Sequence, residues 1–179
     1  MREFLSSIER EWRRYKLLGE GALRQVRDDE LGKRSGPADT DNSIAVVVWH
    51  IAGNLKSRFT DFLTSDGEKP WRDRDSEFMP RPGITRAELM EKWEAGWTAL
   101  FTALEPLADE VLGRTVTIRG EKCRVHDALH RLVAHTSYHV GQIVFLAKLF
   151  RGSEWKSLSI PLGRSEEYNR KLTRERAPE

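Results

Sequence analysis

The sequence predicts an all-α fold, a four-helix bundle, from three observations. Apolar side chains recur at steps of three and four residues along four long segments. Capping residues and a Gly-Pro break mark where these segments begin and end. One long segment between the second and the third has no such periodicity. Amphipathic helices of roughly 22 to 28 residues bury their apolar faces together only in a bundle.

The first two helices are expected on either side of the Gly36–Pro37 break. Apolar side chains line one face from Phe4 to Val26, and this helix is expected to end near the stretch DDELGKRSGP. The stretch DTDNS then offers several N-cap side chains. A second helix follows from Ile44 to about Leu63.

An irregular crossover over residues 64–84 joins the second and third helices. It is rich in proline, glycine and charge, and it is uncommonly long for a compact domain. A segment of about twenty residues reaches up to about 66 Å, enough to return along a whole helix. The second and third helices are therefore expected to run parallel. Trp71 and the run RDRDSEF either form a lid over a pocket or belong to a solvated loop.

The third and fourth helices flank a short connector. Thr85 and Glu88 form a capping box that starts the third helix, which runs to about Leu107. The stretch RTVTIRGEKCRV alternates apolar and polar residues around Arg-Gly, which predicts a short hairpin or an extended connector. Asp127 is expected to cap a fourth helix that ends near Phe150.

Length and composition predict one domain over residues 1–163, followed by a charged tail over 164–179. Four apolar residues are expected to pack an extended segment after the fourth helix: Trp155, Leu158, Ile160 and Leu162. The 30 basic and 28 acidic side chains are interspersed, so neither nucleic acid nor a membrane is expected as a partner. The single cysteine, Cys123, and the polar N-terminus predict a cytoplasmic protein.

The chain has five histidines, and two pairs of them are four residues apart. On a helical wheel, His139 falls inside the apolar sector of the fourth helix and His135 at its margin, whereas His126 and His130 lie outside. Imidazoles at this spacing can reach one ion at about 2.0 to 2.1 Å. His50, near the middle of the second helix, is the candidate third ligand. Inward histidines that are simply hydrogen-bonded in a core explain the pattern equally well.

Three stretches carry a family resemblance: WHIAGNL, HTSYHVGQIV and WKSLSIPLG. Together they resemble the DinB-like, YfiT-type family of metal-binding four-helix bundles. The resemblance implies an up-down-down-up bundle, frequent homodimers and one divalent ion, often zinc or nickel. It places the ligands at His50, His135 and His139. Relatives include transferases and isomerases that use bacillithiol, mycothiol or glutathione, and others named only as hydrolases or damage-inducible proteins.

Two classes of function follow from this ligand set. Three histidines leave an open coordination position, which suits a metal-dependent hydrolase or thiol S-transferase with a small-molecule substrate. The alternative is a non-catalytic bundle that binds metal for dimerisation or a stress response. Asn54 and Gln142, each near a histidine along its helix, are expected to orient ligands or substrate. No carboxylate is expected at the site, and no catalytic residue is assigned. Trp49, which points off the apolar face, is the expected dimer contact.

Overall fold

Four long helices make up most of the computed structural model, which describes residues 1–36 and 42–176. They are α1 (Glu3–Leu23), α3 (Ile44–Phe59), α4 (Arg86–Leu104) and α5 (Val125–Arg151). The shorter elements are α2 (Asp28–Leu31), α6 (Ser165–Arg176), the 3-10 turns η1 (Asp75–Phe78), η2 (Asp109–Val111) and η3 (Gly152–Glu154), and the strands β1 (Thr115–Ile118) and β2 (Glu121–Arg124). The predicted all-α class is confirmed, and in the described residues one small antiparallel hairpin accompanies the helices.

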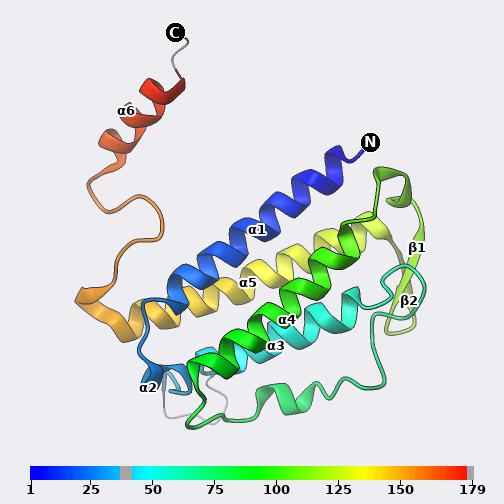
Figure 1. Cartoon of the computed structure of the whole chain (residues 1–179), viewed down its shortest axis with the longest axis horizontal. Coiled ribbons are helices and arrows are strands. Elements are labelled where there is room, and N and C mark those ends of the chain that lie inside the picture. Colours follow the sequence, from blue (N-terminus) through cyan, green and yellow to red (C-terminus); the bar gives the residue numbers. More distant parts are fainter. Residues whose placement is uncertain (37–41, 177–179) are drawn as a thin grey trace.

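The long helices lie side by side, and α6 lies apart from them (Figure 1). In the same view α1 and α5 run one way, whereas α3 and α4 run the other way. Two arginines hold α1 against α4 at both ends. Arg2 donates to the carbonyls of Leu107 and Leu104 at 2.6 and 2.8 Å, and Arg86 donates to those of Leu23 and Val26 at 2.7 Å. Charged donors at the last carbonyls of a helix satisfy groups that have no partner within the helix.

The helix boundaries follow local capping chemistry. Ser43 caps α3 by accepting from the Val46 N–H, and Thr85 starts α4 with the predicted capping box. The expected cap at Asp127 is wrong, because α5 already begins at Val125 with Arg124 as its N-cap residue. The part of the DTDNS stretch before Asn42, like Pro37 in the predicted break, lies outside the described residues.

The first and second helices end earlier than their apolar spacing predicted. Helix α1 stops at Leu23, and Val26 packs into the core from the turn before α2. Helix α3 stops at Phe59, because Thr60 adopts an extended conformation and Asp61 a positive φ of 49°. Phe62 is buried although it lies outside the helix. Apolar periodicity therefore identified residues that enter the core but not the residues at which the helices end.

Helix α3 packs closely against α4. Helix α3 is buried along most of its length, and the indole rings of Trp12, Trp93 and Trp97 are at most 1% exposed. Gly96 of α4 lies against Ala52 of α3, and a Cβ atom built at Gly96 would be only 2.7 Å from the Ala52 Cα. The absence of a side chain at Gly96 thus sets how closely these two helices approach.

The crossover is held against the hairpin. Both Asp66 carboxylate oxygens accept backbone N–H groups of the β1–β2 turn, from Arg119 and Gly120, at 2.8 Å each. The Gly67 N–H donates to the Thr117 carbonyl at 2.8 Å. The hairpin is one of the two conformations expected for this connector, and its register pairs Val116 with Cys123. Crossover and hairpin together enclose one end of the helical core.

The segment after α5 packs only in part. Trp155 and Leu158 pack against the core, but Ile160 is 37% exposed and Leu162 is fully exposed. The prediction that all four apolar residues pack is therefore wrong for the last two. The charged segment that follows forms α6. None of the described helices is both long enough and apolar enough to span a bilayer.

Gly96→Ala tests the close contact between α3 and α4. We expect a loss of about 1 to 3 kcal/mol in the free energy of unfolding, because the new methyl group overlaps the α3 backbone. Urea denaturation monitored by circular dichroism measures it. Gly141→Ala is the matched control in α5, where nothing lies within 4 Å of a built Cβ. It should stabilise the protein by about 0.5 to 1 kcal/mol. Equal effects of the two substitutions would contradict this account.

Candidate metal centre

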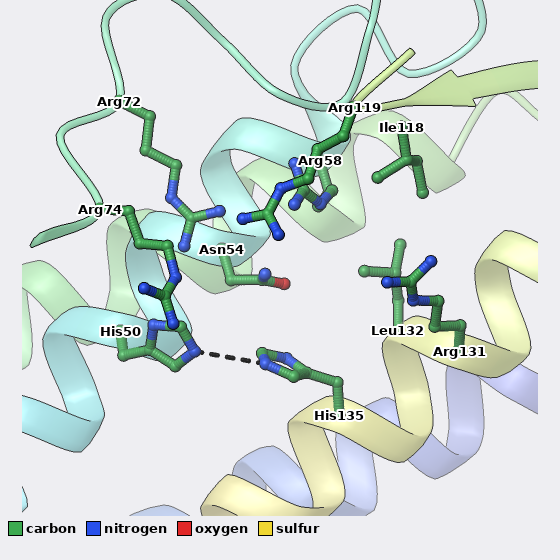
Figure 2. A pocket seen from close by; sticks show the side chains of 10 residues that line it. All are labelled: His50, Asn54, Arg58, Arg72, Arg74, Ile118, Arg119, Arg131, Leu132 and His135. Carbon is green, nitrogen blue, oxygen red and sulfur yellow. Dashed lines mark hydrogen bonds between the residues drawn. The ribbon is translucent and has the colours of Figure 1, made fainter. Parts of the chain in front are cut away.

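Three histidine side chains from two helices converge on one point. His50 comes from α3, and His135 and His139 lie one turn apart on α5. The Nε2 atom of His135 is 3.2 Å from Nε2 of His50 and 3.2 Å from Nε2 of His139. The ring atoms able to bind an ion all lie within 4.8 Å of one another. Figure 2 shows His50 and His135 facing each other across the space between α3 and α5.

The outer nitrogens of two rings have hydrogen-bond partners that decide where the protons lie. The Nδ1–H of His50 donates to Oε2 of Glu77 at 2.9 Å, since a carboxylate only accepts. The Nδ1–H of His139 donates to Oε1 of Gln142 at 2.8 Å. In the neutral form, each of these two rings therefore directs an Nε2 lone pair toward the common point.

This arrangement fits a metal ion better than a network of hydrogen bonds. If Nε2 of His135 carries a proton, it can donate that proton to only one of its two neighbours, which leaves another lone pair without a partner. A cation satisfies all three lone pairs together. For ligands at 2.0 to 2.1 Å, tetrahedral geometry separates nitrogens by about 3.3 Å, close to the observed 3.2 Å. The three histidines could thus hold one divalent ion.

The hydrogen-bond partner of His50, Glu77, corrects the expectation that no carboxylate lies at the site. Glu77 lies in η1 within the crossover and is 5% exposed. It also accepts a bidentate pair from Arg72, at 2.8 Å from Nε and 2.9 Å from Nη2. A Cβ atom on Gly53 would be 2.0 Å from Oε1 of Glu77, so only glycine leaves room for the carboxylate.

Sequence reasoning missed Glu77 and Arg72 because no spacing connects them to the histidines. Both lie in the run RDRDSEF, for which the sequence allows either a lid or a solvated loop. The only signal was the unusual length of the crossover. Contacts across 27 residues of chain, as between His50 and Glu77, follow from tertiary structure alone.

A cavity of about 210 Å³ opens beside His50 and His135. Its walls come from four parts of the chain: α3, the crossover, the hairpin and α5. Asn54 lines it, and its buried Oδ1 has no hydrogen-bond partner among the described residues. Gln142 lies instead on the far side of His139, where it holds Nδ1. The ring of Tyr138 lies 4.5 Å from the ring of His139.

The remaining candidates from the sequence lie elsewhere. His126 lies outside the cluster, and its Nδ1–H donates to the Leu112 carbonyl at 3.0 Å. His130 is exposed and packs against the ring of Phe4. Cys123 lies on β2, where burial and the charge of Asp127 raise the pKa of its thiol. Trp49 is partly buried, with the Arg81 guanidinium 4.5 Å from its ring.

Burial and nearby positive charge lower the pKa of two of the clustered imidazoles, His135 and His139. Burial, followed by the charges of His139, His50, Arg72 and Arg58, lowers the pKa of His135 to about 3. Burial also lowers the pKa of His139 below its usual value. Burial alone would raise the pKa of Glu77, but hydrogen bonds from His50 and Arg72 outweigh it and lower that pKa. Neutral rings beside an ionised carboxylate are the protonation states that metal binding requires.

Comparison with known proteins gives one family. A family model described as "Protein of unknown function (DUF1572)" matches residues 1–164, which include all three histidines and Glu77. The comparisons with curated proteins and with solved structures each give no match.

The lowered pKa of His135 predicts how pH affects the stability of the metal-free protein. Below about pH 6.5 the His135 ring is protonated in the unfolded chain but stays neutral in the folded protein. The free energy of unfolding should therefore fall as pH falls from 6.5 toward 3. Urea denaturation of chelator-treated protein at about pH 7.5 and 5 measures this slope. His135→Gln should reduce the slope, whereas the exposed control His130→Gln should keep it. An unchanged slope in His135→Gln would rule out this role for His135.

Proposed function

The chain belongs to the DUF1572 family, and we propose that it is a divalent-metal-dependent enzyme acting on a small molecule beside His50, His135 and His139. One observation carries the proposal: the Nε2 atom of His135 lies 3.2 Å from those of His50 and His139, and His50 and His135 line an open cavity. A site that served structure alone would be closed by a fourth protein ligand. The histidine cluster found in the described residues has three members.

Kinship with DinB-like, YfiT-type bundles is part of the proposal. The helix directions in Figure 1, with α1 and α5 opposed to α3 and α4, support an up-down-down-up order. The long crossover between α3 and α4 also suits two neighbouring helices that run parallel. Zinc or nickel is the ion we propose, because neutral imidazoles suit both metals. The 3.2 Å between the Nε2 atom of His135 and those of His50 and His139 is close to the distance between two ligand atoms of a tetrahedral site.

The bound ion would supply Lewis acidity, which lowers the pKa of a coordinated water or thiol. Residues of the chain perform the remaining tasks. Glu77 orients His50 and makes its Nε2 a better electron donor, and Gln142 does the same for His139. Asn54 presents an unpartnered carbonyl oxygen to the cavity, where it can accept a hydrogen bond from a substrate.

Hydrolysis and thiol S-transfer are the two reactions we propose for this site. Both reactions need a coordination position on the ion at which water or a thiol can exchange. Both oxygens of Glu77 are already hydrogen-bonded, so Glu77 is not a free general base. Thiol transfer depends less on such a base, because a thiol deprotonates readily at a metal. The non-catalytic alternative, a metal-binding bundle for dimerisation or stress, lacks a use for the cavity.

A homodimer also belongs to the proposal. Three apolar residues of α5 are more than half exposed, namely Tyr138, Phe145 and Leu149, and they supply apolar surface for a second copy. Trp49 remains the contact predicted from sequence, although Arg81 covers part of its ring. A cytoplasmic location likewise remains a prediction from the sequence.

Metal content tests the proposal directly. Wild-type protein dialysed against zinc or nickel should retain one ion per chain, measured by plasma mass spectrometry. His135→Ala should lose it, whereas the matched variant His130→Ala should keep it. Glu77→Gln should weaken binding about 10- to 100-fold, because His50 loses its charged partner. The proposal fails if the wild-type protein holds no stoichiometric metal, or if His135→Ala leaves the metal content unaltered. The three residues would then be hydrogen-bonded core histidines.

Thiol binding separates the two proposed reactions. If the enzyme is an S-transferase, one of the thiols glutathione, bacillithiol and mycothiol should raise the unfolding temperature of the metal-loaded protein. The shift should be absent in His135→Ala and present in His130→Ala. Thermal denaturation with each thiol measures it, with the S-methyl derivative as control. No shift with any of the three thiols would favour the hydrolase.

A further inference from the structure

The cavity beside the histidines is lined by an unusual number of arginines. Five of its ten lining residues are Arg58, Arg72, Arg74, Arg119 and Arg131. None of the ten, all within the described part of the chain, is acidic. Figure 2 shows Arg72, Arg74 and Arg119 reaching toward the space beside the His50 and His135 rings, with Arg131 rising from α5 on the other side.

Carboxylates behind the cavity wall neutralise only part of this charge. Glu77 is the partner of Arg72, whereas a single carboxylate, Glu68, serves both Arg58 at 3.2 Å and Arg119 at 2.7 Å. Arg74 has a fully exposed partner, Asp75, at 3.7 Å. Arg131 has no ion-paired partner among the described residues. Four of the five guanidinium groups are thus ion-paired with three carboxylates.

Repulsion from neighbouring guanidinium groups affects the pKa of Arg58. Burial lowers the pKa of Arg58, and the charges of Arg72 and Arg119 lower it further against the opposing effect of Glu68. Like charges gathered in a cavity are costly unless an anion joins them. A bound oxyanion would relieve this repulsion, and guanidinium groups suit carboxylate and phosphate oxygens in particular.

The backbone at Arg119 is held in a costly conformation that brings its side chain to the cavity. Arg119 has a φ of +56° at the first position of a two-residue hairpin turn, where asparagine or glycine is usual. Asp66 fixes the turn through the two N–H groups of Arg119 and Gly120, and Glu68 fixes the guanidinium. Strain maintained by specific contacts is typical of functional positions.

The cavity also contains one acceptor that needs a donor. Asn54 is 7% exposed, and its Oδ1 has no hydrogen-bond partner among the described residues. A hydroxyl or amino group on the ligand, next to its anionic group, would satisfy this oxygen. The volume of about 210 Å³ equals about seven water molecules and therefore limits the ligand to a small molecule.

We propose that this cavity binds a small oxyanion, so that the substrate of the enzyme carries a carboxylate or phosphate group. The anionic group pairs with the exposed guanidinium groups of Arg119, Arg131 and Arg74, and the reactive part of the molecule faces His50 and His135. The position of the reactive part rests on the proposed metal-dependent function. The oxyanion site itself stands on the arginines alone.

Calorimetric titration with inorganic phosphate and with malonate tests the proposal. Both are titrated into metal-loaded and metal-stripped wild-type protein, with chloride at matched ionic strength as reference. At least one anion should bind to both forms, since the arginines do not need the ion. Arg119→Gln and Arg131→Gln should each weaken binding about tenfold or more, because each removes charged hydrogen bonds. The control Arg14→Gln, a mostly exposed position on α1, should bind as wild type does.

Metal content measured in the same samples separates this proposal from the metal-dependent function. If wild type holds no metal but Arg119→Gln and Arg131→Gln still lose the anion, the oxyanion site stands and the metal-dependent function fails. If metal is present but neither anion binds, or if both variants bind as tightly as Arg14→Gln, the oxyanion site is refuted. Binding of phosphate alone assigns a phosphate ester, and binding of malonate alone assigns a carboxylic acid.

Discussion

The hydrogen bond between Glu77 and His50 is the interaction on which the site depends. It joins the crossover to α3 and selects the tautomer of His50 that directs Nε2 at the other two rings. Glu77 can remain ionised at 5% exposure because Arg72 meets it with two further hydrogen bonds. Removing one partner from such a buried pair typically costs about 3 to 5 kcal/mol, because a charge is left without compensation. The crossover therefore both packs against α3 and positions a ring of the candidate metal centre.

Close backbone approaches make this arrangement possible. Gly53 leaves the space that the Glu77 carboxylate occupies, and Gly96 allows α3 and α4 to meet at Ala52. Both glycines lie inside helices, where glycine reduces stability by roughly 0.5 to 1 kcal/mol relative to alanine. The close contacts that Gly53 and Gly96 permit offset this loss of stability. The same reasoning applies to Arg119, whose positive φ is supported by the carboxylate of Asp66.

Charge is distributed so that two kinds of ligand can meet in one place. The imidazoles of α3 and α5 direct their Nε2 atoms at one another, whereas the crossover and the hairpin bring guanidinium groups to the adjoining cavity. The positive charges of Arg72 and Arg58 help to lower the pKa of His135. The arginines thus help to keep a ring of the candidate metal centre unprotonated, and they line the cavity in which we propose that an anion binds.

The sequence alone determined the helical class, most of the core and the inward pair His135 and His139. These follow from local rules, since apolar spacing and i,i+4 geometry depend on residues within one helix. His50 lies on another helix, and as a third ligand it was a candidate that the family resemblance supported. Helix ends were less accurate, because Thr60 and Asp61 break α3 where the apolar pattern continues to Phe62. Only the tertiary structure brought Glu77, Arg72 and Arg119 to the histidines. Their contacts cross long stretches of chain without a repeating pattern, so the packing of crossover and hairpin against α3 and α5 decides them.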